Sequence, residues 1–253
     1  MFGGQRSVPM VLRTPHGGGL GAGPQHSQCL EAWFAHVPGL KVVMPATPYD
    51  AKGLLIAAVR DGNPVLYIDD RWLYDLQGDV PESLYEVPIG SAALRRSGRD
   101  VTLLATSYMA SEATKAVEVL TQRGIDVESI DLRSIKPWDR NLVYSSVGKT
   151  GRLVIADAAW MSGGIAAEIA ASVAGEIFHA LKAPIGRICL PDVPAPTSAV
   201  LEQAYYIGAE DIVSAVEQVY KSNRSDKVVA LIQDVIEQAR AFHESNAAKE
   251  QHP

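Results

Sequence analysis

A glycine-rich stretch that ends in a histidine holds the residues best suited to chemistry. Five glycines occur among residues 17–23, and Gln25, His26 and Ser27 follow shortly after. Glycine has no side chain, so such a loop can turn sharply and approach another surface closely. An imidazole at its end can transfer a proton near neutral pH or present a fixed tautomer to a ligand. His26 is therefore the first candidate for a catalytic residue.

The same pattern also has a structural interpretation. Glycine loops follow strands in many α/β proteins, and a single histidine at a helix start is often a cap or a packed side chain. His16 is then a loop residue, while His36 and His179 end predicted helices, where a positive ring suits the helix dipole. The residue types alone leave both interpretations open.

Strands and helices alternate around this loop. Residues 8–12 are continuously apolar, which is typical of a strand covered on both faces of a parallel sheet. Thr47 followed by Pro48 predicts the capped start of a helix with an apolar stripe. The first part of the chain is therefore predicted to be an open parallel sheet with helices packed on it. Its predicted elements are strands at 8–12, 41–44 and 65–68 and helices at 29–36 and from 48 onward.

The second part repeats the alternation after an irregular stretch at 69–88, whose aromatic residues indicate that it packs on the rest of the chain. Beyond Ser222, apolar residues recur at three- and four-residue steps and predict one more helix. That helix packs on its own body or contacts a partner chain. The predicted elements are strands at 101–105, 127–132, 153–156 and 185–190 and helices at 111–123, 139–147, 164–181 and 210–220. The last stripe consists of Val228, Leu231, Ile232, Val235, Ile236, Ala239 and Phe242.

Composition narrows the class of protein. The 253 residues allow two domains, and 47% hydrophobic with 21% charged residues is an ordinary globular balance. A net charge of −6 without a basic run argues against nucleic-acid binding. No apolar stretch approaches the ~18 residues of a membrane span, and the first residues do not read as a signal peptide, so we expect a cytoplasmic protein. Cys29 and Cys189 lie in apolar settings and are expected to be buried free thiols.

Several motifs resemble the beta subunits of the thiamine-diphosphate-dependent 2-oxoacid dehydrogenases, such as pyruvate and branched-chain 2-oxoacid dehydrogenase, with transketolases as close relatives. The likeness runs in order and at family spacing from about residue 3 to 221. The motifs that carry it are VPMVLR at 8–13, the glycine loop with QHSQ at 25–28, PGLKVV at 38–43, DAKGLL at 50–55, RDGNP at 60–64, VPIG at 87–90, RSIKP at 133–137 and DVPAP at 192–196.

The resemblance implies an α/β fold in several parts. The expected order is the C-terminal part of a pyrimidine-binding domain at 1–75, a linker at 76–90, a transketolase C-terminal domain at 91–222 and a helical tail at 223–253. Family members usually carry a further half-domain before the first strand, so we expect that segment to be missing. It normally holds the glutamate that drives ylide formation and an aromatic residue against the aminopyrimidine ring, and neither can be assigned here.

The resemblance also implies a cofactor and a partner. In the family, thiamine diphosphate lies between two subunits of an alpha2-beta2 heterotetramer, and the alpha subunit holds its diphosphate and magnesium through a Gly-Asp-Gly motif followed by an Asn. That motif is absent from this sequence. The beta subunit supplies the pyrimidine side and a histidine at the position of His26, whose ring Gln25 and Ser27 are expected to hold. The implied substrate is a 2-oxo acid that is oxidatively decarboxylated, with acyl transfer to a lipoyl acceptor.

Several beta subunits also hold a potassium ion with backbone carbonyls. Carbonyls at a helix C-terminus lack intrahelical partners, which a cation can satisfy. The alternative is that Asn63 or water caps this helix end. The matching positions are Met10, Ala58, Val59, Asp61 and Asn63.

Two departures leave other functions open. Beta subunits of the large complexes often dock the lipoyl-bearing core protein through an acidic residue before an Ala-Pro pair, and Lys182 stands there instead. Residues 69–74 replace a stretch that commonly bears a glutamate. The alternatives are a split transketolase-type enzyme that transfers two-carbon units and a truncated subunit that assembles without catalysing.

Overall fold

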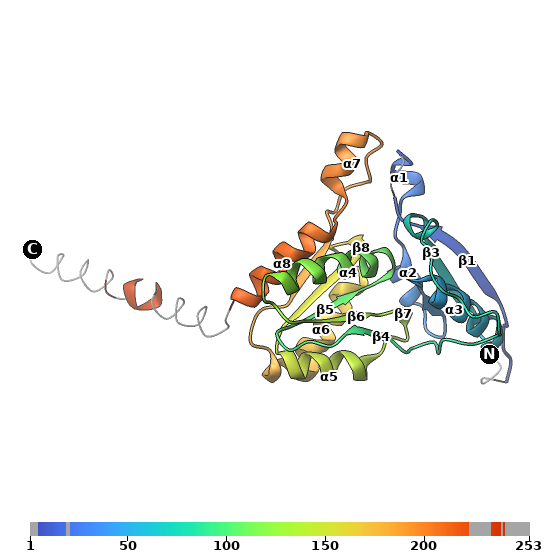
Figure 1. Ribbon diagram of the computed structural model, residues 1–253, viewed down its shortest axis with the longest axis horizontal. Helices are drawn as coiled ribbons and strands as arrows, with labels where there is room; N and C mark the ends of the chain where they lie inside the picture. Colours follow the sequence, from blue (N-terminus) through green and yellow to red (C-terminus); the bar gives the residue numbers. More distant parts are fainter. Residues whose placement is uncertain (1–4, 19–20, 223–233, 239, 241–253) are drawn as a thin grey trace, which may run out of the picture.

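The structure is a computed structural model that describes residues 5–18, 21–222, 234–238 and 240. Two sheets lie next to each other, with helices on their faces, and the α1 and α7 segments project together from one side (Figure 1). No helix in the described part of the chain is both long and apolar enough to cross a bilayer. The predicted α/β architecture is confirmed.

The first sheet has the order β1-β3-β2-β7. β1 (Val11–His16) and β2 (Lys41–Val43) both pair in parallel with β3 (Val65–Asp70). α3 (Pro48–Arg60) connects β2 to β3, and the Thr47 hydroxyl accepts a hydrogen bond from Asp50 N at 3.1 Å, as the predicted cap requires. The helix predicted at 29–36 is present as the shorter α2 (Glu31–Ala35), and a further short helix, α1 (Gly23–His26), was not predicted.

The fourth strand of this sheet comes from the second part of the chain. β7 (Ser134–Lys136) pairs antiparallel with β2, through Val42 with Lys136 and Val43 with Ser134. The sequence prediction missed this strand because three residues are too few to show a period. The first sheet is thus completed by a distant segment.

The predicted strand at 8–12 is wrong in its position and in its burial. β1 starts at Val11 rather than Val8, and Met10 and Leu12 are 44% and 43% exposed. The reason is that β1 is an edge strand, which pairs only with β3 among the described residues. Apolar character therefore does not indicate a covered strand here.

The second sheet has the order β4-β6-β5-β8-β9. Its four parallel strands are those predicted, and β4 adds an antiparallel edge that was not predicted. Leu103 faces the core under α4 and α8, whereas its neighbour Leu104 faces the core under α5 and α6. This alternation shows a sheet covered on both faces. The strands are β4 (Ala93–Arg96), β5 (Val101–Ala105), β6 (Val127–Asp131), β8 (Leu153–Trp160) and β9 (Gly186–Leu190).

The helices of the second part differ from prediction mainly at their ends. α4 begins four residues before the expected 111, and the helix expected at 164–181 divides into α6 and a 3₁₀ turn. Another short helix, α7, and a 3₁₀ turn after β3 were not predicted. The bounds are α4 (Ser107–Gln122), α5 (Arg140–Thr150), α6 (Ile165–Ile177), η2 (Phe178–Ala180), α7 (Ala199–Tyr205), α8 (Ala209–Lys221) and η1 (Arg71–Leu73).

Aromatic residues after β3 pack on the body, as the sequence indicates. The Tyr85 ring stacks on Tyr49 at a centroid distance of 4.4 Å, and Trp72 contacts the rings of Tyr108 and Tyr206. The stripe predicted beyond Ser222 falls mostly outside the described residues, and its two described members are exposed. These are Val235 and Ile236.

Candidate functional site

His26 lies at the end of α1 with an exposed side chain. Arg71 fixes the backbone on both sides of the glycine loop, because its guanidinium donates hydrogen bonds to the carbonyls of Gly17 and His26, each at 2.7 Å. A third donation reaches the carbonyl of His16 at 3.2 Å. The loop position of His26 is therefore held by a side chain from the turn after β3.

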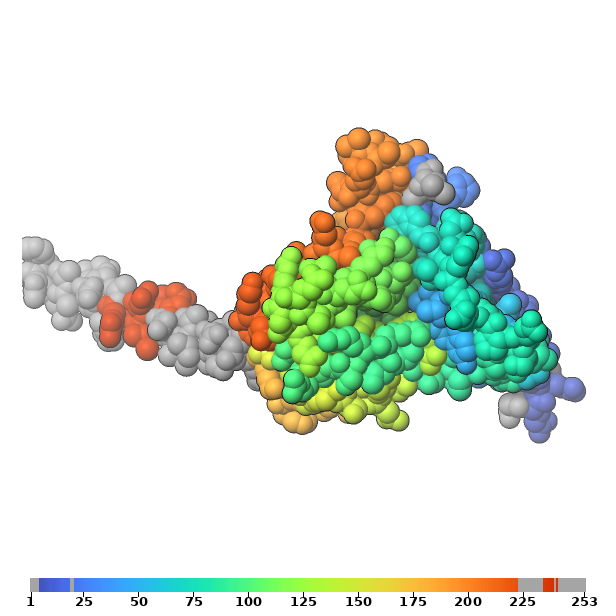
Figure 2. Space-filling view, viewed as in Figure 1, coloured from blue at the N-terminus to red at the C-terminus, as the bar shows by residue number. Residues whose placement is uncertain are grey.

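The glycine loop packs closely on α7. Gly21 N donates to both carboxylate oxygens of Glu202 at 3.1 Å, and a Cβ placed on Gly18 would lie 1.5 Å from the Tyr206 hydroxyl. Any side chain at Gly18 would collide with that ring. Figure 2 shows the α7 segment, in orange, beside the blue α1 segment on the surface. The close approach expected of this loop is thus present, and its partner is α7.

The two residues expected to hold the His26 ring lie in different environments. Gln25 is exposed, whereas Ser27 is buried and its hydroxyl has no hydrogen-bond partner among the described residues. Neither forms a hydrogen bond with the imidazole in this part of the chain. Pro24 and Gln28, on either side, line a groove of about 420 Å³ together with Trp160. His26 therefore lies on the short segment that borders this groove.

A second histidine lies beneath the loop in a buried cluster. The register of β1 and β3 places His16 opposite Asp70, and His16 Nε2 lies 3.1 Å from Asp70 Oδ2. The other ring nitrogen, Nδ1, lies 3.2 Å from Cys29 Sγ. Glu31 and Asp157 are also buried, each 1% exposed. His16, interpreted above as a loop residue, is instead a packed residue among acidic groups.

The electrostatics of this cluster follow from burial. Burial, and then the charge of nearby Asp157, raise the pKa of Glu31 to about 7. Burial also raises the pKa of Asp157. Burial opposes protonation of His16, but Cys29 and Asp70 outweigh it and raise the pKa of the imidazole. Burial raises the pKa of the Cys29 thiol, so this thiol is not an activated nucleophile.

The predicted cation ligands lie around the end of α3. Met10 O accepts a hydrogen bond from Val65 N at 2.9 Å. The Asp61 carboxylate is paired with the Lys41 ammonium, and Asn63 donates to Asp61 Oδ1 at 3.1 Å. Ala58 is buried, and its carbonyl accepts from Asp61 N at 3.4 Å, whereas Val59 is 66% exposed. Asn63 also donates to the Asp61 carbonyl at 3.5 Å, which is the capping arrangement given above as the alternative.

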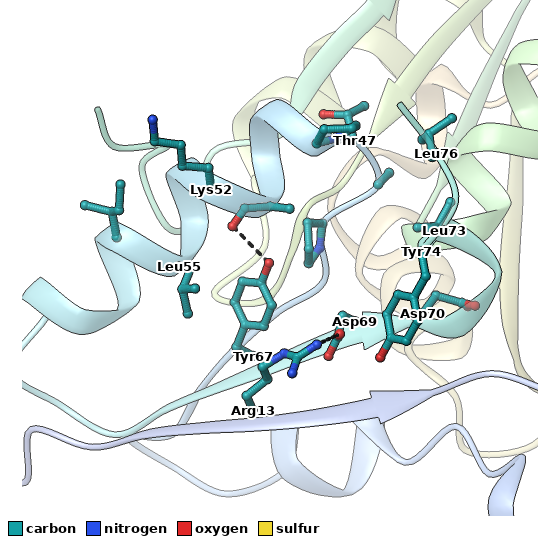
Figure 3. A pocket seen from close by; sticks show the side chains of 15 residues that line it. Arg13, Thr47, Lys52, Leu55, Tyr67, Asp69, Asp70, Leu73, Tyr74 and Leu76 are labelled. Carbon is teal, nitrogen blue, oxygen red and sulfur yellow. Dashed lines mark hydrogen bonds and ion pairs between the residues drawn. The ribbon is translucent and has the colours of Figure 1, made fainter. Parts of the chain in front are cut away.

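A cavity of about 670 Å³ lies between α3 and the ends of β1 and β3 (Figure 3). Arg13 forms an ion pair with Asp69 at its floor, and the Tyr67 hydroxyl donates to Ala51 O at 2.9 Å. Burial raises the pKa of Tyr67, so the phenol stays neutral at physiological pH. Sequence analysis did not predict this cavity, because its walls come from three separate segments of the chain, at residue 13, within 45–56 and within 67–76.

Comparison of the chain with known proteins identifies its family. The family model described as transketolase, pyrimidine binding domain matches residues 1–75, and the one described as transketolase, C-terminal domain matches residues 90–212. The chain is 41% identical to the pyruvate dehydrogenase E1 component subunit beta of Porphyra purpurea, over 88% of this chain and 67% of that protein. The chain belongs to the beta-subunit family of the 2-oxoacid dehydrogenases.

Other members of the family are similar to the same degree. Acetoin:2,6-dichlorophenolindophenol oxidoreductase subunit beta of Cupriavidus necator is 44% identical, over 88% of this chain and 66% of that protein. Its counterpart in Bacillus subtilis is 46% identical, over 85% and 63%. The chain thus spans 59–66% of the length of the first curated relatives. A solved structure titled split gene transketolase, inactive beta4 tetramer, shares the fold, with a TM-score of 0.71 at 24% identity over 85% of this chain and 67% of that one.

The residues present in this chain fit one side of a thiamine diphosphate site. His26 is exposed on a segment whose Pro24 and Gln28 line a groove, and the family model that matches residues 1–75 is a pyrimidine-binding domain. No Gly-Asp-Gly motif for a diphosphate and magnesium occurs in the sequence. The family match therefore indicates the pyrimidine side of such a site.

Sequence reasoning missed the buried cluster, although a signal for it was present. His16 and Asp70 end neighbouring parallel strands, and ligands in parallel sheets bind at the carboxyl ends of the strands. Cys29 and Glu31 come from the segment that follows the loop. Only the strand order β1-β3, which the sequence does not reveal, brings these ends together.

Proposed function

We propose that this chain is the beta component of a two-chain thiamine diphosphate enzyme that acts on a 2-oxo acid or on acetoin, which is named in two of its relatives. The observation that carries the proposal is the exposed His26 side chain, whose backbone Arg71 holds on a segment that borders a groove and that packs on α7 through the glycine loop. An exposed imidazole on a fixed backbone suits a residue that completes a site at a boundary between chains.

The proposed partner is an alpha subunit. It would supply the diphosphate and magnesium site whose motif this chain lacks, in an alpha2-beta2 heterotetramer. A potassium ion at the end of α3 belongs to the same proposal, with carbonyls of Met10, Ala58, Val59, Asp61 and Asn63 as its ligands. Acyl transfer to a lipoyl-bearing core protein is the proposed continuation of the reaction.

This chain's own residues would position groups and move a proton. Thiamine diphosphate, when bound, would supply stabilisation of negative charge on the carbon atom that was the substrate carbonyl. His26 would donate or accept a proton at the substrate oxygen, because its side chain is exposed and an imidazole nitrogen can play either role. Arg71 and Glu202 would hold the loop so that the ring keeps its position during turnover.

Reconstitution tests the proposal. The chain is co-expressed with an alpha-type subunit, and the purified complex receives thiamine diphosphate, magnesium and pyruvate or acetoin, with 2,6-dichlorophenolindophenol as electron acceptor. We expect dye reduction that requires both chains and the cofactor, because each chain supplies a different side of the site. Transfer of two-carbon units between sugar phosphates without dye reduction would assign the transketolase-type function instead. A stable complex that turns over no donor would assign an assembly role.

A further inference from the structure

His16, Cys29 and Glu31 form a compact buried group beneath the glycine loop. One ligand atom from each lies within 4.8 Å of the other two, and the side chains are 4%, 6% and 1% exposed. We propose that these three residues bind a divalent transition metal ion of the zinc class.

The donor atoms suit such an ion. Zinc binds imidazole nitrogen, thiolate sulfur and carboxylate oxygen, and bonds of about 2.0–2.3 Å in a tetrahedron place two ligands roughly 3.5 Å apart. His16 Nδ1 and Cys29 Sγ are 3.2 Å apart, so they need to separate by only a few tenths of an ångström to share one ion. The combination of nitrogen, sulfur and oxygen disfavours magnesium and calcium, which take oxygen ligands.

Asp70 supports the histidine from the other side. Its Oδ2 lies 3.1 Å from His16 Nε2, while its Oδ1 accepts a hydrogen bond from Trp72 N at 3.0 Å. A carboxylate that holds one ring nitrogen fixes the tautomer and leaves the other nitrogen free for a metal. Gly17 packs against this carboxylate, since a Cβ there would lie 2.6 Å from Oδ1. Asp70 is thus fixed in the orientation that a metal-binding His16 requires.

Two unpartnered carboxylates point to a missing ligand. Both oxygens of Glu31 and one oxygen of Asp157 are buried without a hydrogen-bond partner among the described residues. The other Asp157 oxygen accepts from Thr106 at 3.3 Å. Leaving buried carboxylates unpaired is costly, and a divalent cation removes that cost. A thiolate, one carboxylate and a neutral imidazole balance the charge of a divalent ion, and a water molecule can complete the tetrahedron.

The inference is independent of the function proposed above, because the group lies beneath the loop and His26 lies on its exposed end. The ion would link the end of β1 to the start of α2, and Asp70 at the end of β3 would support its histidine ligand. Binding energy at such a site adds directly to folding stability.

Metal content and cobalt spectroscopy test the site. The full chain, alone or with its co-purified partner, is expressed with zinc and analysed by mass spectrometry, and then stripped and loaded with Co²⁺. We expect about one zinc per chain and a cobalt–thiolate absorption band. Cys29→Ser should abolish the band, and Glu31→Gln should lower zinc occupancy severalfold. Cys189→Ser is the matched control, because it removes the other buried thiol and should change neither readout.

Two results would overturn the proposal. One is a purified wild-type chain that contains no zinc and takes up no cobalt even when loaded at excess metal. The other is a cobalt–thiolate band that persists in Cys29→Ser but disappears in Cys189→Ser. Should Cys29→Ser fail to fold, His16→Gln replaces it, and the metal content of the wild type still decides the question.

Discussion

At the scale of single residues, two histidines from one loop region have opposite environments. His16 is 4% exposed and lies among Cys29 and Asp70, whereas His26 is exposed and has only its backbone held. The two histidines lie ten residues apart, and the sequence around them does not reveal this difference in burial. A buried histidine serves structure or a metal, while an exposed one on a fixed backbone can meet a substrate. The environments therefore assign different roles to the two rings.

We predict that His26→Ala lowers turnover of the reconstituted enzyme by about 10²-fold, the usual contribution of a proton-transferring side chain. Its thermal stability should change by no more than about 0.5 kcal/mol, because the residue is exposed. Steady-state kinetics and thermal melting of the complex measure the two effects. His179→Ala, an exposed histidine on the 3₁₀ turn after α6, is the control. Turnover within twofold of the wild type would remove His26 from the site.

At the scale of elements, one carboxylate joins α3 to the second part of the chain. Asp50 is 0% exposed, and it pairs with Arg95 of β4 and, at 2.9 Å, with Arg133 before β7. Burial alone would raise the pKa of Asp50, but the hydrogen bond from Thr47 and the two guanidinium groups lower it. This network connects the sheets at the point where β7 joins β2.

We predict that Asp50→Ala lowers the free energy of unfolding by about 3 kcal/mol, because it leaves two partly buried guanidinium groups without their shared partner. Urea denaturation measures the loss. Glu86→Ala breaks the exposed pair with Arg60 and should cost no more than about 0.5 kcal/mol. Equal effects of the two substitutions would contradict the role of Asp50.

The same carboxylate gives a pH dependence with a defined sign. Its folded pKa lies below the unfolded value of about 3.9, so its contribution is complete above that pH and is lost as the pH falls through the folded pKa. Asp50→Asn should therefore lose less stability than the wild type on acidification below about pH 4.

Elements with a clear period could be predicted, and short ones could not. Thr47 and Pro48 predicted the start of α3, and apolar runs predicted the four parallel strands of the second sheet. β7 and α7 lack a pattern of their own, since their positions depend on β2 and on the glycine loop. His26 could be named from its motif, but the cluster around His16 needed the strand order. Local signals predict local structure, and sites built from distant segments require the fold.

At the scale of the whole molecule, electrostatic attraction and repulsion influence which proteins the chain binds. The net charge of −6 favours basic partners, but Lys182 places one positive charge on an exposed side chain. The Lys182 ammonium donates to Thr150 O at 3.3 Å, and its alkyl chain covers Gly151. The resemblance implies an acidic residue at this position in many beta subunits, so a lysine here would repel the basic segment of a lipoyl-bearing core protein that such a residue attracts.

We predict that Lys182→Glu strengthens binding of the reconstituted complex to such a core protein by about tenfold, since it replaces repulsion with attraction at the contact. Isothermal titration calorimetry at two salt concentrations measures the change. Lys221→Glu reverses an exposed charge at the end of α8 and should leave affinity within twofold. An unchanged affinity in Lys182→Glu would place docking elsewhere.

The strand at 134–136 also bears on any attempt to exchange parts between related subunits. A hybrid that takes residues 1–75 from one relative and the remainder from another would join β2 and β7 of different origin at their shared seam. In such a hybrid, β2 and β7 of one sheet would come from different proteins. The ion pairs of Asp50 with Arg95 and Arg133 would also join residues of different origin. Crossover points chosen from the family-model boundaries alone would therefore divide the first sheet, because β2 and β7 lie on opposite sides of that boundary.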